Sequence, residues 1–88
     1  MAYELYLSDD ARERLFTLGK KNRASLRTVL KKLAQVCQDP HRYKPLTGNL
    51  AGKYRGHVLS SFVITYRVDD SQGVVKVLVF DHHDEAYK

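Results

Sequence analysis

The chain has 88 residues, of which 43% are hydrophobic, and 15 Lys and Arg against 10 Asp and Glu give a formal net charge of +5. This length suits one domain, 1–88, and the apolar content excludes an intrinsically disordered chain. The excess of positive charge in so small a domain favours an acidic partner, either nucleic acid or an acidic protein segment.

The compartment is indicated by a few simple features. Cys37 is the single cysteine, so no intramolecular disulfide forms, and its place in an apolar helical pattern indicates a small core residue. No run approaches the ~20 apolar residues that cross a bilayer. The N-terminus carries early acids and no basic segment, unlike a signal peptide. We therefore expect a cytoplasmic protein with no membrane partner.

The first half of the chain predicts a strand and two helices. Residues 3–7 alternate apolar and polar side chains and are rich in tyrosine, which indicates a strand. Ser8 offers a cap for a helix that continues to about Gly19, a residue able to adopt a left-handed cap. A second helix follows, with apolar residues at three- and four-residue steps, and ends at Asp39-Pro40.

The second half predicts a sheet. A loop suited to nucleotide contact is expected over His41–Pro45, and a turn over Thr47–Asn49. The expected strands are Lys53–Leu59, Phe62–Val68 and Val74–Phe80, with a hairpin loop over Asp69–Gly73 and a short polar turn in the tail, 81–88. This order predicts an α+β fold, in which two helices pack on one face of a mostly antiparallel sheet and leave the other face partly open.

The strand expected after Gly52 carries the clearest chemical pattern. If it is extended, Lys53, Arg55 and His57 share one face, while Tyr54 and Val58 share the other. Two fixed cations beside a side chain that moves protons near neutral pH suit work on phosphodiesters. The alternative, which the spacing alone leaves open, is the solvated polar face of an antiparallel sheet.

Metal and cofactor chemistry find little support in the sequence. His82 and His83 are adjacent and flanked by acids, but adjacent residues of a strand point to opposite faces, and no zinc-finger spacing is present. The chain has no phosphate-binding loop, no dinucleotide fingerprint and no nucleophile elbow. We therefore expect no metal and no cofactor.

A set of short motifs in fixed order points to a family. They are Pro45-Leu46-Thr47-Gly48, Gly52-Lys53-Tyr54-Arg55, His57, Phe62-Val63-Ile64-Thr65-Tyr66, and His83 four residues before the closing aromatic Tyr87. With these motifs the chain resembles the RelE/ParE superfamily of bacterial and archaeal toxins, and most closely its YafQ-like messenger-RNA interferases. The resemblance covers nearly the whole chain in the order of its elements.

The resemblance implies a RelE-like βααβββ fold and the toxin of a type II toxin–antitoxin system. The activity implied is that of a ribosome-dependent, metal-independent endoribonuclease, which cuts messenger RNA in the vacant decoding site. The 2′-hydroxyl attacks the adjacent phosphate and leaves a 2′,3′-cyclic phosphate. The implied partners are a cognate antitoxin, the ribosome and messenger RNA.

The resemblance also assigns roles to residues. It gives proton transfer to His57 and His83, base positioning to Tyr87, and phosphate contact to Lys53 and Arg55. Lys44 stands where this branch often has a histidine, and it either binds phosphate or acts as a base. Ser61 stands where the branch often has an aspartate, and serine cannot orient a histidine by charge. These two departures leave the division of labour open.

Other functions remain open as well. The ParE branch shares the fold but poisons DNA gyrase, and it usually lacks this set of histidines. A degenerate toxin or a non-catalytic RNA-binding protein would also carry this charge. His41 and His82 are interpreted as surface histidines, and Tyr54 and Tyr66 as core aromatics. Arg23, Arg27, Lys31 and Lys32 form either a solvated helix face or a contact surface for ribosomal RNA or the antitoxin.

Overall fold

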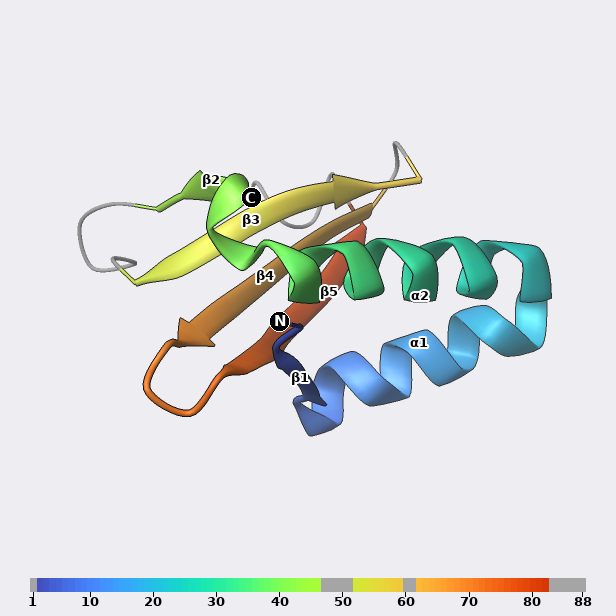
Figure 1. Ribbon diagram of the computed structural model, residues 1–88. Coiled ribbons are helices and arrows are strands. Elements are labelled where there is room, and N and C mark those ends of the chain that lie inside the picture. The colour runs from blue at the N-terminus through green and yellow to red at the C-terminus, as the bar shows by residue number, and fades with distance from the viewer. Residues whose placement is uncertain (1, 47–51, 60–61, 83–88) are drawn as a thin grey trace.

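A two-helix hairpin covers one face of a five-stranded sheet in the computed structural model of this chain (Figure 1). The structure describes residues 2–46, 52–59 and 62–82. Its elements are β1 (Glu4–Leu7), α1 (Asp9–Lys21), α2 (Arg23–Gln38), the 3₁₀ helix η1 (Pro40–Arg42), β2 (Lys44–Pro45), β3 (Lys53–Val58), β4 (Phe62–Asp69) and β5 (Val74–His82). The predicted α+β class, with one strand, two helices and three longer strands, is confirmed.

Short polar side chains begin both helices. The Ser8 hydroxyl accepts a hydrogen bond from Ala11 N at 3.1 Å at the start of α1. The side-chain oxygen of Asn22 accepts one from Ser25 N at 3.1 Å at the start of α2. Each cap satisfies a backbone N–H that has no partner within its helix, which fixes the two starting points.

The first helix is longer than predicted. The sequence places its end near Gly19, whereas the structure continues α1 to Lys21 and ends it at Asn22. Gly19 serves the packing of the two helices, because a Cβ there would lie only 2.6 Å from Leu26 Cδ2 of α2. The glycine is therefore explained by close helix approach and not by a left-handed cap.

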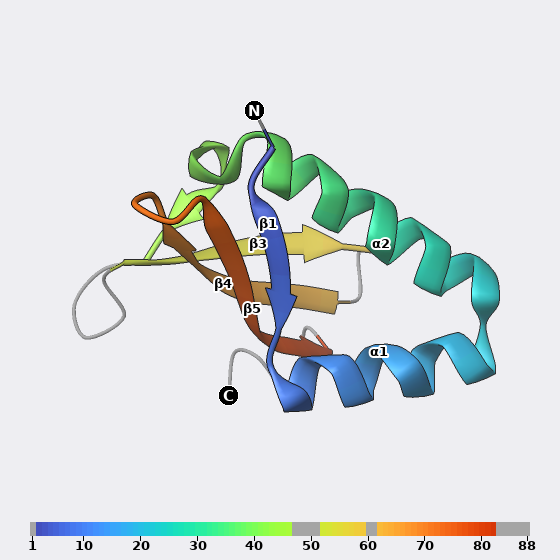
Figure 2. The ribbon, with the colours of Figure 1, turned by 60° about the horizontal axis from the view of Figure 1, so that its bottom comes forward.

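The sheet is mixed. Its strands are ordered β1-β5-β4-β3-β2, and β2, β3, β4 and β5 pair antiparallel with one another. β1 pairs parallel with β5, and Figure 2 shows these two strands side by side. The mostly antiparallel arrangement is thus confirmed, with one parallel edge strand added. We call the face of the sheet opposite to the helices the outer face.

The segment between α2 and β3 corrects the sequence prediction. A loop is expected over His41–Pro45, but η1 is followed there by the two-residue edge strand β2. Pairing with β3 places Lys44 opposite Arg55 and Pro45 opposite Tyr54. Two residues are too few for a period-two pattern to be visible in the sequence, which is why the strand was not predicted.

The ends of the longer strands also differ from the prediction. β3 ends at Val58 because Leu59 adopts a left-handed φ of 57°. β4 continues to Asp69, and β5 continues to His82, so the tail begins as strand and not as the predicted turn. The rest of that turn and the turn expected at Thr47–Asn49 lie outside the described residues.

The core fills the space between the helix hairpin and the sheet. Cys37 is 5% exposed, as its helical setting predicts, and burial raises the pKa of its thiol. Tyr66 is fully buried, as predicted, and donates a hydrogen bond from its hydroxyl to the carbonyl of Pro40 at 2.8 Å. Burial also raises the pKa of Tyr66, because a phenolate would lose its hydration there.

One extra residue in β5 decides which of its side chains face the core. β4 pairs Val77 and Val79 with consecutive residues of its own, which leaves Leu78 between them as a bulge. The Ser8 hydroxyl donates a hydrogen bond to the Leu78 carbonyl at 2.7 Å. Val77 and Phe80, three residues apart, are consequently both buried. The bulge is therefore supported by the residue that caps α1.

Candidate active site

β3 carries the candidate site because its side chains alternate between the two faces of the sheet. Tyr54 and Val58 pack against the core, while His57 is exposed. Lys53 and Arg55 have the same parity as His57 and are half-buried. The structure thus places the two cations and the histidine on one face of the strand, the outer face.

The spacing along the strand places the two cations at different distances from His57. A strand rises about 3.3 Å per residue, so the Cα of Arg55 lies roughly 7 Å from that of His57, and the Cα of Lys53 roughly 13 Å away. In the β2–β3 pair, the backbone of Lys44 is in register with that of Arg55. Arg55 is therefore the nearer of the two cations to His57 along the strand, and Lys53 lies about twice as far away.

The core beneath the site is aromatic and ties β2 to the sheet. The ring of Tyr54 stacks on that of Tyr66 with centroids 5.5 Å apart, and Tyr43 meets Tyr66 edge-on at 6.4 Å. The Tyr66 hydroxyl binds the carbonyl of Pro40, the first residue of η1. Because only Tyr43 separates η1 from β2, this bond helps to fix where the backbone of Lys44 lies.

Three further side chains on the outer face were not among the predicted site residues. Arg67 on β4 pairs in register with Lys53, Lys76 on β5 pairs with Arg67, and Tyr6 on β1 pairs with Lys76. Arg67 and Lys76 are exposed, and Tyr6 is 52% exposed. Alternation from the inward Tyr66 would have found Arg67, whereas apolar neighbours on both sides hid Lys76.

The row of the sheet that contains His57 holds one carboxylate. His57 pairs in register with Val63, and Val63 with Asp81 on β5. Arg14 of α1 binds the carboxylate of Asp81 at 2.9 Å and that of Asp10 at 3.3 Å. Asp81 is thus two strands away from His57 and engaged by a helix, so it is poorly placed to orient the imidazole.

A second histidine belongs to a hydrogen-bonded cluster at the rim of the core. His41 Nε2 lies 2.7 Å from a carboxylate oxygen of Asp70, and His41 Nδ1 lies 2.7 Å from the Tyr54 hydroxyl. The Tyr3 hydroxyl donates to the same Asp70 oxygen at 2.6 Å. These bonds from Tyr3 and His41 lower the pKa of Asp70, and the bond to Asp70 raises the pKa of Tyr3. His41 is exposed, as predicted, and its cluster links four segments of the chain.

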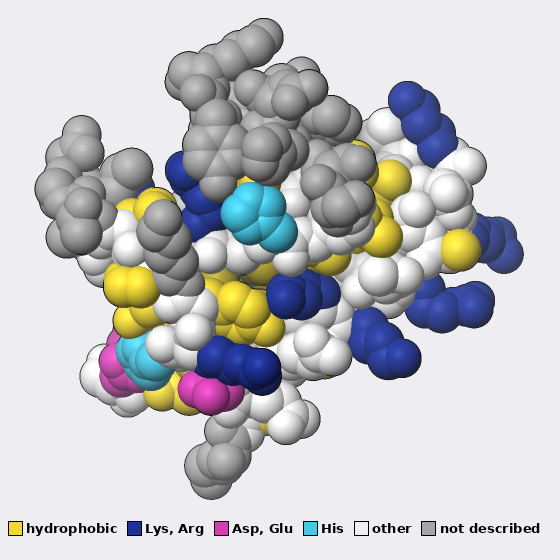
Figure 3. All heavy atoms as spheres, turned by 90° about the horizontal axis from the view of Figure 1, so that it is seen from above, with side chains coloured by type: hydrophobic (Ala, Val, Ile, Leu, Met, Phe, Trp, Pro, Cys, Tyr) yellow, Lys and Arg dark blue, Asp and Glu magenta, His cyan; other side chains and the backbone are white. Residues whose placement is uncertain are grey.

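Positive charge also gathers on the helices. No Asp or Glu occurs in residues 14–38, and the exposed cations of α2 include Arg23, Arg27 and Lys31. Lys32 Nζ lies 4.6 Å from the centre of the Tyr43 ring. In the view of Figure 3, Lys and Arg side chains predominate, and Asp and Glu appear at one end only. This surface agrees with both predicted interpretations, a solvated face and a contact surface.

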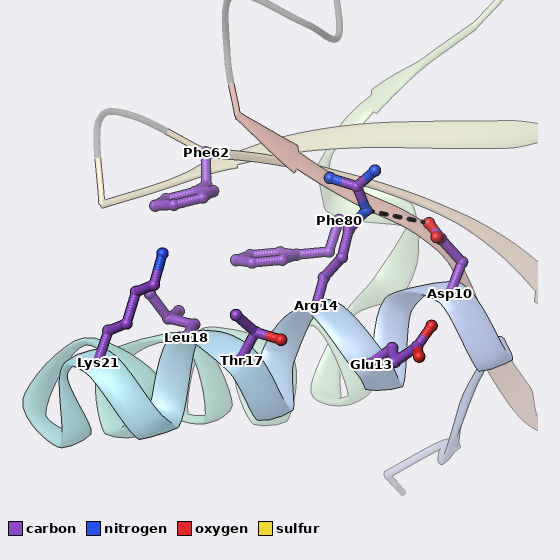
Figure 4. Close-up of a pocket in the computed structure, with 8 residues that line it drawn as sticks. All are labelled: Asp10, Glu13, Arg14, Thr17, Leu18, Lys21, Phe62 and Phe80. Carbon is purple, nitrogen blue, oxygen red and sulfur yellow. Dashed lines mark ion pairs between the residues drawn. The ribbon is translucent and has the colours of Figure 1, made fainter.

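A cavity of about 520 Å³ opens on the helix side of the sheet, between α1, the start of β4 and β5. Its apolar lining comes from Leu18, Phe62 and Phe80, and the two phenylalanine rings stack with centroids 4.9 Å apart (Figure 4). Its polar rim is formed by Asp10, Glu13, Arg14, Thr17 and Lys21. The cavity is separated from His57 by the sheet itself.

Part of the predicted site is outside the described residues. His83, Tyr87 and Ser61 are not among the residues that the structure describes, so their predicted roles stay predictions. Within residues 2–46, 52–59 and 62–82, no three His, Cys, Asp or Glu side chains gather so that they could hold a metal ion. Neither helix in this part of the chain has the length and apolar character that crossing a bilayer requires.

Comparison with known proteins places this fold in a family. Residues 5–87 match the family described as the ParE toxin of type II toxin-antitoxin system, parDE. The chain is 36% identical over 86 residues to a Methanocaldococcus jannaschii protein named for the RelE toxins, RelE4, with 98% of this chain and 92% of that protein covered.

Two solved structures have the same fold. One is the toxin–antitoxin complex RelBE2 from Mycobacterium tuberculosis, with a TM-score of 0.79, 27% identity, and coverage of 94% of this chain and 100% of that chain. The other is a mutant of Escherichia coli toxin RelE in the free state, with a TM-score of 0.70, 23% identity, and coverage of 99% and 90%. At its lower identity, the second similarity shows the fold alone.

Helices on one face of the sheet and cations with a histidine on the other define a small α+β protein of the RelE-like class. The chain belongs to the RelE/ParE superfamily, the toxins of type II toxin–antitoxin systems. These matches do not distinguish the YafQ-like branch from its relatives, so that finer assignment stays a prediction.

Proposed function

We propose that this chain is a ribosome-dependent, metal-independent endoribonuclease that cuts messenger RNA and so inhibits translation in the cytoplasm. The observation that carries the proposal is the exposed His57 on the outer face, two residues from Arg55 on the same strand. Phosphodiester cleavage requires a group that transfers protons beside fixed cations that stabilise the charge of the transition state. A strand held by the aromatic core supplies both groups in a fixed relation.

The proposed reaction is an internal transfer of the phosphate. The 2′-oxygen forms a bond to phosphorus as its proton passes to a base, and the bond from phosphorus to the 5′-oxygen breaks as that oxygen receives a proton from an acid. His57 and His83 are assigned these two proton transfers. Arg55 and Lys44 are assigned the charge on the non-bridging oxygens, and Tyr87 the positioning of a base. His83 and Tyr87 enter through the family resemblance alone.

The test compares two exposed histidines. His57→Ala should lower the rate of messenger cleavage on programmed ribosomes by about 10²- to 10⁴-fold, the usual contribution of a general acid or base. His41→Ala is the matched control and should cleave at close to the wild-type rate. Thermal melts of both variants check the fold, and 2′,3′-cyclic phosphate ends identify the reaction. A His57→Ala protein that cleaves as fast as the wild type would reject the proposal.

Poisoning of DNA gyrase is the second candidate, because the matching family is described as the ParE toxin. The two activities are separated by assaying one preparation both for cleavage on ribosomes and for inhibition of supercoiling by gyrase. Inhibition of gyrase without cleavage of messenger RNA would mean that the chain is a gyrase poison and not an endoribonuclease.

We further propose that an antitoxin neutralises the chain, with acidic residues directed to Lys53, Arg55 or the basic face of α2. The segment that wraps the toxin folds on binding, and the cavity between α1 and β4 receives one of its apolar side chains. Charge complementarity then speeds association and narrows the choice of partner.

The cavity offers a test of this partner. Thr17→Trp places a large ring at the exposed rim and should weaken binding of the protein encoded by the adjacent gene by tenfold or more. Thr28→Trp, on an exposed position of α2 outside the cavity, is the control. Equal binding by both variants would show that the cavity is not part of the interface.

A further inference from the structure

Three positively charged side chains and one tyrosine form a row across the outer face of the sheet. Lys53, Arg67 and Lys76 are partners in register on β3, β4 and β5, and Tyr6 on β1 completes the row. Arg67 and Lys76 also line one side of a surface hollow of about 400 Å³, and Asp69 and Asp70 lie in its lining as well. We call these four residues the cationic row.

The cationic row is unfavourable for the folded chain on its own. Neighbouring strands lie about 4.8 Å apart, and like charges directly opposite one another destabilise an antiparallel pair. No ion pair to Lys53, Arg67 or Lys76 occurs among the residues that the structure describes. A cost of this kind is explained if an anionic ligand neutralises the row.

The carboxylates beside the row form no ion pair with it among the described residues. The next row outward contains Asp69 and Glu4, which pair in register with Val74. The carboxylate of Asp69 accepts hydrogen bonds from Ser71 Oγ at 2.7 Å and from Gln72 N at 3.2 Å, within its own turn. These acids instead mark the outer limit of the positive surface, so a polyanion would lie between this limit and His57.

We propose that the cationic row binds the backbone of single-stranded messenger RNA beside the cleaved phosphodiester, with Tyr6 as the surface on which a flanking base stacks. The proposal rests on the function proposed above. Lys53 lies about 13 Å from His57 along β3, so the row contacts a neighbouring nucleotide and not the reacting phosphate. An exposed aromatic ring beside cations suits nucleic acid, because every base has a face that can stack. An acidic peptide would also pair with the three cations, but it would leave Tyr6 without a role.

The row therefore positions RNA and takes no part in the chemistry. Removing two of its charges should raise KM for messenger cleavage and leave kcat near the wild-type value. The effect on binding is electrostatic and depends on salt. For a single strand, the salt slope falls by about 0.7 for each phosphate that the protein no longer neutralises.

The experiment measures binding of a short single-stranded RNA to protein with His57→Ala, which prevents cleavage, over a range of salt concentrations. Adding Arg67→Gln and Lys76→Gln should reduce the slope of log K against log salt by about 1.4, from two phosphates at about 0.7 each. Adding Tyr6→Leu should weaken binding about 5- to 150-fold at unchanged slope, the effect of losing one stacked base. Arg27→Gln with Lys31→Gln removes the same charge from α2 and should change neither quantity.

Each contrary outcome has its own meaning. If the α2 control variant lost as much RNA affinity as the row variant, the effect would be one of net charge, and the proposal would be overturned. A row variant that keeps RNA binding but no longer binds the antitoxin, or no longer binds vacant ribosomes, would assign the row to that partner and also overturn it. Wild-type cleavage with an unchanged KM in the row variant would refute the inference and leave the proposed function standing. Absence of cleavage by the wild type would instead refute the proposed function, while the salt slope still decides whether the row binds RNA.

Discussion

The hydroxyl of Tyr66 offers a quantitative test of how the core holds the edge of the sheet. It is fully buried and donates one hydrogen bond, to the carbonyl of Pro40 at 2.8 Å. Tyr66→Phe keeps the ring that stacks on Tyr54 and leaves a carbonyl without its donor. A buried polar group left in this way costs about 1–3 kcal/mol. For a domain of this size each kcal/mol lowers the melting temperature by about 4–8 °C.

We therefore expect Tyr66→Phe to melt roughly 8–16 °C lower than the wild type, for a mid-range cost of about 2 kcal/mol. Tyr43→Phe is the control, because its hydroxyl makes no side-chain hydrogen bond with the residues that the structure describes. Calorimetry or urea unfolding at neutral pH measures both variants. If Tyr66→Phe were as stable as Tyr43→Phe, the bond to Pro40 would not hold η1 to the sheet, and our account of how β2 is positioned would be wrong.

Three further changes test other parts of the structure. Because hydrogen bonds from Tyr3 and His41 lower the pKa of Asp70, the ionised carboxylate stabilises the fold above its ordinary pKa of about 4, and this contribution is lost as the pH falls through the lowered value. Asp70→Asn should therefore reduce the urea midpoint more at pH 7 than at pH 3; equal effects at both pH values would contradict this. Gly73→Ala should cost about 1–2 kcal/mol in urea unfolding, because Gly73 has a left-handed φ of 67°, and no cost would show that the turn adapts. Leu33→Ala should cost about 2–5 kcal/mol, because this side chain is 1% exposed in the core, and a smaller loss would mean that the helices close over the cavity.

The sequence predicted the elements that have a strong local signal. Alternation along β3 separates Tyr54 and Val58 from His57, and the structure gives this strand the same two faces. The helix stripe and the Asp39-Pro40 stop likewise describe α2, which ends at Gln38. In these segments the side-chain period and the chain breakers agree, so local reasoning is sufficient.

The parts that were missed depend on contacts between distant segments. β5 is apolar on both sides, so its sequence shows neither the bulge at Leu78 nor the outward direction of Lys76. The cluster at Asp70 joins Tyr3 to a turn 67 residues away. The cationic row needs the register of four strands before its members become neighbours. None of these arrangements has a signal at the level of neighbouring residues.

The division of the sheet into two faces links the stability of this toxin to its site. A slip of β3 by one residue would exchange the core residues Tyr54 and Val58 for the cations and His57, so the register must be held firmly. The stack of Tyr54 on Tyr66 and the bond from Tyr66 to Pro40 hold it from the helix side. The outer face is then free to carry like charges that weaken the fold, because the inner face supplies the compensating burial. Changes on the inner face should consequently alter stability and activity together, whereas changes at exposed positions of the outer face should alter ligand binding without lowering stability.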